Sequence, residues 1–172
     1  MTRWLRRNRW YLLALLVLIP GALAVSLVPR FFPYLANLPT YQSVARGETV
    51  RYSGADVELT DLEVLDGTAI GAPPGSDVVV ATLTIDVVDP PESAYCDLAV
   101  VATSGGVERR WDEQAYLAID YEIPAGFEEV CRFDEPGSYR AQFTFLVPHG
   151  EVADPVVEFT SSAELPRVLR LN

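Results

Sequence analysis

Few side chains in this sequence are of the kinds that carry out reactions. His149, between Pro148 and Gly150, is the only histidine in 172 residues. Nucleophilic hydrolysis needs a base that holds a proton near neutral pH beside a serine or cysteine. No nucleophile motif, phosphate-binding glycine loop or zinc-ligand spacing accompanies His149 in the sequence. We therefore expect His149 to be a turn residue, and we expect no catalytic residue and no bound metal or cofactor.

Three pairs of adjacent acids are the second candidates for chemistry. They are Asp112-Glu113, Glu128-Glu129 and Asp134-Glu135. Paired carboxylates can cleave a glycosidic bond, but neighbouring residues of a strand point to opposite faces, so these pairs are expected in solvent. The alternative function is a secreted or anchored cell-wall glycan hydrolase. It requires two acids that face each other across one concave site beside Trp111, with Glu113 and Glu128 as the acids to replace.

Cys96 and Cys131 are the only cysteines in the sequence. Both follow an N-terminal segment that, as argued below, places them outside the cell, where thiols oxidise and persist as disulfides. We therefore expect a Cys96–Cys131 disulfide, which stabilises the fold by about 4 kcal/mol through the loop that it closes. A two-cysteine metal site would need further histidine or cysteine ligands, and His149 is the only other candidate.

Aromatic side chains are the candidates for recognition. Trp111, Tyr116 and Tyr121 lie on or beside a long irregular segment. Exposed aromatics on loops supply the anchors of many binding surfaces, so we expect these three residues to form the binding site if they are exposed. A single tryptophan in a small β-sandwich also serves as a core anchor, and the sequence leaves both roles open for Trp111.

The elements that must hold these residues have the pattern of short strands. Apolar residues alternate with polar ones, most clearly over 138–147, and turn residues separate the runs. Val57 and Leu59 are out of phase with Leu62, which predicts a β-bulge near Asp61. We expect strands over 48–52, 57–64, 78–88, 96–102, 107–111, 130–133, 138–147, 156–159 and, at a sheet edge, 167–171, with a long connection between sheets over 112–129.

Strands of this length and spacing favour an all-β fold, an antiparallel two-sheet sandwich, with a small barrel as the alternative. Three motifs sharpen this expectation: Gly54 to Leu59, Pro74-Gly75 before a long strand, and Phe143 to Pro148. Through them the region from roughly residue 48 to 160 resembles the telokin-like, immunoglobulin-like extracellular domains of bacterial, actinobacterial-type envelope proteins of unknown function. The resemblance implies an anchored, non-catalytic binding or accessory module of the cell envelope. Cys96 and Cys131 are not fixed features of that group.

The N-terminal segment predicts a location. Arg3, Arg6, Arg7 and Arg9 precede a charge-free run over 10–28, and this run, when helical, nearly matches the roughly 30 Å hydrocarbon core of a bilayer. The positive-inside preference keeps the arginines in the cytoplasm and the remainder of this single-pass protein outside the cell. The alternative is cleavage after Ala24, in the small-x-small pattern Ala22-Leu23-Ala24, which would secrete the protein.

These signals divide the chain into four parts: a basic cytoplasmic tail over 1–9, a transmembrane signal-anchor helix over 10–28, a juxtamembrane connector over 29–47 and an extracellular β-sandwich over 48–172. All 24 acidic residues but only 8 of the 13 basic residues lie beyond residue 40, so that region carries a net charge of −16. Such a surface argues against nucleic acid as a partner. The expected partners are the membrane, through residues 10–28, and another membrane or cell-wall protein.

Overall fold

The structure is a computed structural model, and it describes residues 7–8, 10–11, 14–23, 25–26, 38–92, 94–113 and 119–172. The chain forms two units, Met1–Leu38 and Pro39–Asn172. In the first unit, the described residues between 7 and 26 are helical. No helix in the described part of the chain is both long and apolar enough to cross a bilayer. The transmembrane helix expected over 10–28 stays a prediction, and connector residues 29–37 lie outside the described residues.

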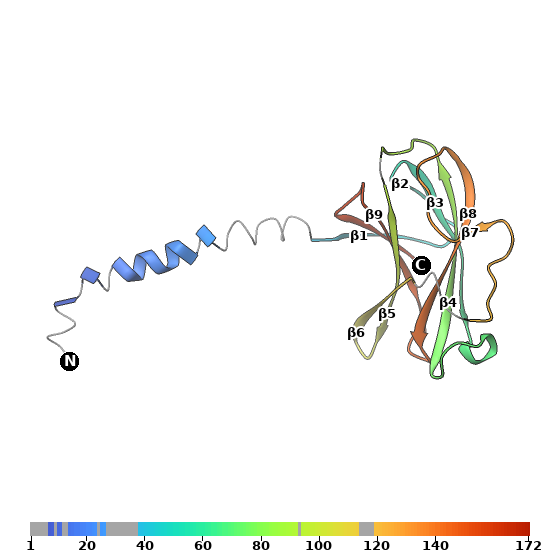
Figure 1. The fold of residues 1–172 in the computed structure, drawn as a ribbon, viewed down its shortest axis with the longest axis horizontal. Coiled ribbons are helices and arrows are strands. Elements are labelled where there is room, and N and C mark those ends of the chain that lie inside the picture. The colour runs from blue at the N-terminus through green and yellow to red at the C-terminus, as the bar shows by residue number, and fades with distance from the viewer. Residues whose placement is uncertain are drawn as a thin grey trace. The chain divides into compact units, whose positions relative to one another are not determined.

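The second unit is a β-sandwich of two five-stranded sheets (Figure 1). Sheet A contains, in spatial order, β1 (Thr40–Val44), β10 (Arg167–Leu171), β9 (Val156–Ser161), β5 (Cys96–Ser104) and β6 (Val107–Asp112). Sheet B contains β2 (Thr49–Tyr52), β3 (Ala55–Leu65), β4 (Ser76–Val87), β8 (Gly137–Pro148) and β7 (Phe127–Glu128). A short 3-10 helix, η1 (Gly67–Ile70), lies between β3 and β4. The all-β, two-sheet sandwich predicted from the sequence is confirmed, but the sheets are not wholly antiparallel, because β1 pairs with β10 and β7 with β8 in parallel.

The core lies between the sheets because alternate side chains of each strand point inward. Strands β4 and β8 pair along their whole lengths and supply the largest share of sheet B's buried face. Their inward residues are Val79, Ala81, Leu83, Ile85, Val87, Ala141, Phe143, Phe145 and Val147. Leu98, Val157 and Phe159 of sheet A belong to the same buried cluster. The β-branched and aromatic residues that favour strands therefore also fill the core.

Two local predictions about the strands are confirmed. The β3–β4 register shifts between Leu59 and Asp61, so that Leu59 and Leu62 are both buried despite their opposite phase in the sequence. This is the β-bulge expected near Asp61. Strands β5 and β6 form the expected hairpin, and its turn residues Gly105 and Gly106 both adopt positive φ, which glycine does without steric cost.

Three predictions about strands and boundaries are wrong. Residues 40–44, assigned to the connector over 29–47, form β1, so the sandwich begins before residue 48. Only Val44 of β1 is buried, which leaves no apolar alternation for a sequence pattern to detect. Because β1 pairs with β10, strand 167–171 is not a sheet edge. The strand expected over 130–133 is absent, and a two-residue strand, β7, lies just before this segment. The backbone of Arg132 bonds to a side chain instead of a neighbouring strand: the Tyr139 hydroxyl accepts from its N–H and donates to its carbonyl, both at 2.7 Å.

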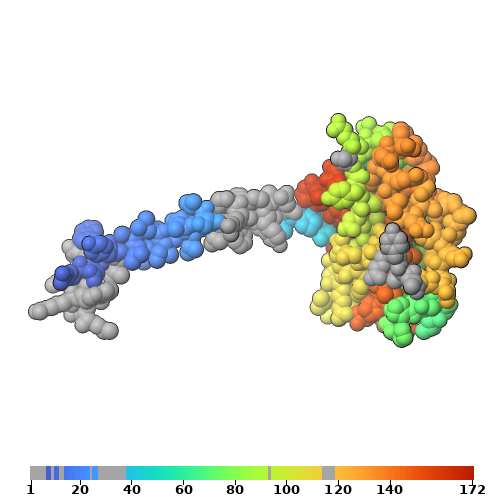
Figure 2. All heavy atoms as spheres, viewed as in Figure 1, coloured from blue at the N-terminus to red at the C-terminus, as the bar shows by residue number. Residues whose placement is uncertain are grey.

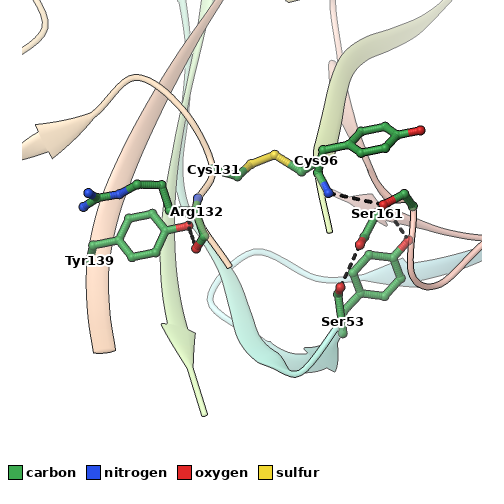
Figure 3. Close-up of a disulfide and its surroundings, with 9 residues drawn as sticks. Ser53, Cys96, Cys131, Arg132, Tyr139 and Ser161 are labelled. Atoms are coloured by element: carbon green, nitrogen blue, oxygen red, sulfur yellow. Dashed lines mark hydrogen bonds between the residues drawn. A yellow bond between two sulfur atoms is a disulfide. The ribbon is translucent and has the colours of Figure 1, made fainter. Parts of the chain in front are cut away.

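Side chains join the two sheets at one end of the sandwich (Figure 3). Tyr52 of β2 is fully buried, and its hydroxyl donates to the Arg167 carbonyl at 2.6 Å and accepts from the Ser161 N–H at 3.1 Å. The hydroxyls of Ser53 and Ser161 lie 2.7 Å apart. Each bond runs from sheet B to the β9–β10 region of sheet A, so buried polar groups are satisfied and the sheets are held in one register.

The predicted Cys96–Cys131 disulfide is confirmed. The two Cα atoms are 6.1 Å apart, within the range that a disulfide spans. Cys96 begins β5 in sheet A, and Cys131 lies in the segment that leads from β7 to β8 in sheet B. The disulfide therefore joins the irregular β7–β8 connection, next to sheet B, to the start of β5 in sheet A (Figure 3).

Candidate functional site

The outer face of sheet A contains a buried carboxylate. Glu158 lies on β9 between Val157 and Phe159, which both point into the core, so its side chain points away from the core. Only 3% of that side chain is exposed. A carboxylate removed from water is destabilising unless opposite charges and hydrogen bonds replace its hydration.

Two arginines provide that compensation from opposite sides. Arg170, in register with Glu158 on the neighbouring β10, donates from Nε and Nη2 to Oε1 at 3.0 and 2.8 Å. Arg110 on β6 donates from Nη1 to Oε2 at 2.7 Å. It reaches across β5, where Ala99 stands opposite Glu158 and its methyl group leaves room for the guanidinium. Both carboxylate oxygens are therefore paired with a charged donor.

Further acids and one aromatic ring hold the arginines in place. Arg110 donates to Asp112 at 3.0 Å and to Asp97 at 3.4 Å, and Arg170 donates to Glu108 at 2.9 Å. The guanidinium of Arg170 also lies 3.9 Å from the ring centroid of Tyr41. We call the group of Arg110, Arg170, Glu158, Asp97, Asp112, Glu108 and Tyr41 the arginine cluster. Its members come from all five strands of sheet A, so only the assembled sheet creates it.

The acidic groups of the cluster raise the pKa values of its two arginines. Burial lowers the pKa of Arg110, but hydrogen bonding to Asp112 and the negative charges of Glu158, Asp112 and Asp97 outweigh this effect and raise the pKa overall. The pKa of Arg170 is raised in the same way, with Glu158 and Glu108 outweighing burial. Both guanidiniums therefore stay charged at any pH at which the protein is folded.

A shallow hollow of about 250 Å³ adjoins the cluster. Val101, Ala102 and Val156 line it together with Glu108, Asp154 and Arg170, which supply charges of both signs. Apolar surface beside fixed polar groups is the usual composition of a recognition site. The face can therefore make directional contacts to a polar partner while excluding water from an apolar patch.

The aromatic residues predicted to form the binding site do not share one exposed surface in the described part of the chain. Trp111 is half-buried and packs against the core, opposite Val100. Tyr121 is also half-buried, and its hydroxyl donates to Gln142 Oε1 on sheet B at 3.0 Å. Tyr116 lies outside the described residues. Trp111 therefore has the contacts of a core anchor, and a binding role for the three residues stays a prediction.

The three pairs of adjacent acids do not form one site: Asp134 and Glu135 are both exposed, and the members of the Asp112-Glu113 pair point different ways. Asp112 points outward to Arg110, whereas Glu113, the next residue, is half-buried. Glu128 is paired with Arg132 at 2.7 Å. Burial and, second, the charge of Asp97 raise the pKa of Glu113 to about 7. Among the described residues, no group of three or more histidine, cysteine or acidic side chains is placed to hold a metal ion.

Replacing Glu113 by glutamine will stabilise the protein at alkaline pH. A carboxyl whose folded pKa lies above its unfolded value contributes stability at low pH, and this contribution is lost as the pH rises through about 7. Since Glu113 is partly exposed, solvent screening limits the gain at about pH 8 to the order of 1 kcal/mol. Urea unfolding at several pH values measures it. Equal pH dependence of the two proteins between about pH 5 and 8 would contradict the burial of this charge.

A second polar pair holds two loops at the other end of the sandwich. Asp77, at the start of β4, accepts from His149 Nδ1 at 2.9 Å and from the N–H groups of Gly150 and Gly67 at 3.1 and 3.4 Å. The hydrogen bond to His149 lowers the pKa of Asp77. Reciprocally, this hydrogen bond and the charge of Asp77 raise the pKa of His149. His149 is a turn residue, as predicted, with 69% of its side chain exposed.

His149 will titrate above the usual histidine pKa, and Asp77→Asn will return its pKa toward about 6.5. The His149 contribution to stability is present below the unfolded pKa and is lost as the pH rises through the raised folded value. The Asp77 contribution is lost as the pH falls through its lowered pKa. Because the chain has one histidine, its ring signals in an NMR titration are unambiguous. Identical titration curves in wild type and variant would refute the pairing.

The fold is a β-sandwich domain, and the outer face of its sheet A carries a connected group of charged side chains. No protein-family model matches the sequence, and no curated protein matches it. An uncharacterised β-sandwich protein from Clostridium difficile is similar in structure, with a TM-score of 0.43 and 10% sequence identity over 77% of this chain and 95% of that one. A candidate lipoprotein from Bacillus subtilis has a TM-score of 0.42 and 11% identity, covering 72% of this chain and 37% of that one.

The sequence pattern did not identify Glu158, Arg110 and Arg170, which lie at the centre of the outer face of sheet A. Glu158 could have been detected, because it is a charge inside the otherwise apolar run Val156-Val157-Glu158-Phe159. Its two arginine partners lie 48 and 12 positions away in sequence. Their approach depends on strand order and register, which no local pattern contains.

Proposed function

We propose that this protein is a membrane-anchored extracellular binding or accessory module of a bacterial cell envelope, without catalytic activity. The observation that supports the binding role is the arginine cluster. It holds a nearly fully buried carboxylate on an outward-facing sheet surface, beside a hollow that is lined by both apolar and charged side chains. A fixed array of charges over apolar surface is pre-organised for a partner, so little side-chain freedom is lost on binding.

We infer further that the sandwich is immunoglobulin-like. The spatial order β3-β4-β8-β7 corresponds to strands A, B, E and D, and the order β10-β9-β5-β6 corresponds to G, F, C and C′ of a variable-type domain. Three features depart from that plan. Strand β2 extends sheet B beyond β3, the strand matched to A. Strand β7 is parallel to β8, and the disulfide does not join the B and F strands. The correspondence therefore rests on strand order and connectivity.

The anchor and its orientation form part of the proposal. The charge-free run over 10–28 and the arginines before it support insertion with the C-terminal domain outside the cell. The disulfide supports an oxidising compartment for the sandwich. Intact-mass measurement of the protein extracted from its native membrane tests the anchor, because a mature N-terminus at Val25 would instead show a secreted, cleaved protein.

Site-specific photo-crosslinking in the native membrane tests the binding role. A photoreactive residue at Asp97, on the outer face of sheet A, should yield an adduct with a membrane or cell-wall protein. A probe at Glu63 on β3, which is exposed on the other sheet, is the matched control. Equal adducts from both positions, or none from Asp97, would remove this face as the binding surface. Trp111→Ala and Tyr121→Ala in the Asp97-probe protein test the predicted aromatic anchors.

A glycan hydrolase remains the second candidate, favoured by one observation. Burial raises the pKa of Glu113 to about 7, which suits a general acid, and Glu113 directly follows β6, two residues after Trp111. Turnover of purified wall glycan that Glu113→Gln abolishes would establish this function. Absence of turnover by the intact chain, with the crosslinking result above, would favour the binding role.

A further inference from the structure

One end of the sandwich lies where the chain enters it, and we call this the proximal end. Strand β1 starts there at Thr40, opposite the start of β10 at Arg167. Strand β9 ends there at Ser161, opposite the start of β5 at Cys96. The β9–β10 turn and the end of the β4–β5 loop are joined by a hydrogen bond from the Ser162 N–H to the Tyr95 carbonyl, at 3.1 Å. Figure 2 shows the β9–β10 turn (red) beside the start of β5 (yellow-green) and β1 (cyan).

Three large apolar side chains extend from the loops of this end into solvent. Tyr95 is 72% exposed, Leu165 61% and Val88 55%. Backbone hydrogen bonds fix the chain at or beside each of these residues. The Val88 N–H donates to the Gly54 carbonyl at 3.1 Å. Leu165 precedes Pro166, whose carbonyl accepts from the Thr40 N–H at 2.8 Å. Their exposure is therefore fixed by the fold, and burying each would be favourable by about 1–2 kcal/mol.

We infer that the proximal end rests on the lipid bilayer, with Val88, Tyr95 and Leu165 in its interfacial layer; this inference rests on the proposed membrane anchor. The connector over 29–39 has 11 residues, so it can span no more than about 40 Å even when fully extended. The proximal end is thus held near the bilayer at high effective concentration. Tyrosine, with an apolar ring and a polar hydroxyl, is enriched at this depth of a membrane.

The charge of the proximal end determines which lipid conditions favour the contact. Asp89 and Glu92 follow Val88 in the β4–β5 loop, and both oppose approach to an anionic bilayer. Their repulsion acts over about 10 Å at about 0.1 M salt and weakens as salt increases. The contact is therefore apolar in origin, stronger on zwitterionic lipid, and strengthened by salt on anionic lipid. A basic membrane-binding surface has the opposite salt dependence.

Tryptophan fluorescence in vesicles tests the contact with the full chain. Trp4, Trp10 and Trp111 are replaced by phenylalanine, so that an introduced Tyr95→Trp or Leu165→Trp is the one tryptophan and reports on the proximal end. Val107→Trp is the matched control, because Val107 is 61% exposed but lies at the β5–β6 turn, at the other end. In phosphatidylcholine vesicles containing brominated lipid, we expect both proximal probes to be quenched at least about twofold more than the Val107 probe. On anionic vesicles, raising salt from about 0.05 to 0.5 M should increase their quenching.

Two results separate the inference from the proposed function. Failure of the chain to float with vesicles would refute the anchor. Flotation with equal quenching at positions 95, 165 and 107 would refute the contact while leaving the anchor intact. Quenching on anionic vesicles that decreases with salt would also refute it, because the contact would then be electrostatic.

Discussion

Replacing Arg110 and Arg170 together by methionine will destabilise the domain by about 3–5 kcal/mol. Methionine retains much of the apolar stem of arginine but leaves Glu158 without a cation. The Glu158 side chain is only 3% exposed, so water cannot replace that cation. The uncompensated carboxylate must then lose its charge or unfold the sheet around it. Each single replacement will have a smaller effect, because the other arginine still pairs with one carboxylate oxygen. Urea unfolding followed by circular dichroism measures the loss.

The decisive control adds Glu158→Gln to the double variant. Glutamine has nearly the same shape without the charge, so the triple variant should regain most of the lost stability. Recovery shows that the buried charge, not the loss of arginine packing, causes the effect. A double variant as stable as the wild type would show that Glu158 reaches water in solution, contrary to the structure.

Removing the disulfide, by Cys96→Ser with Cys131→Ser, will lower the stability by about 3–4 kcal/mol. The bond closes a loop with a sequence separation of 35 residues, and its loss frees the segment between β7 and β8. Thermal unfolding of wild type and variant, each with and without reductant, measures the effect. Reductant should destabilise the wild type to the level of the variant and leave the variant unchanged. A reductant effect of equal size in both proteins would attribute the loss to something other than this bond.

The parts of the fold that could be predicted from the sequence are those with a local physical signal. Strands β4 and β8 have long period-two patterns because one face of each is buried throughout. The β-bulge at Asp61 changes the phase of that pattern, and the Gly105-Gly106 turn marks a hairpin. Strand β1 has no such signal, since four of its five residues are not buried and it forms only by pairing with β10.

The site was harder to predict than the fold for a related reason. Recognition was expected from aromatic residues on loops, but Trp111 packs against the core and Tyr121 bonds to sheet B. The arginine cluster draws its members from β1, β5, β6, β9 and β10, with Glu158 at its centre and Tyr41 at one margin. Apart from Glu158, which interrupts an apolar run, the charged members each look like ordinary surface charges in the sequence. Only the register of sheet A turns them into one connected group.

The parallel pairing of β1 with β10 also determines how the domain responds to force. The two strands are in register from Thr40 opposite Arg167 to Val44 opposite Leu171. Tension on the chain before Thr40 pulls β1 along its own length, whereas the hydrogen bonds between the strands run across that direction. These bonds are then loaded in shear and must break together, instead of opening one after another from an end. A domain tethered through β1 therefore resists pulling more strongly than its free energy of unfolding alone would indicate.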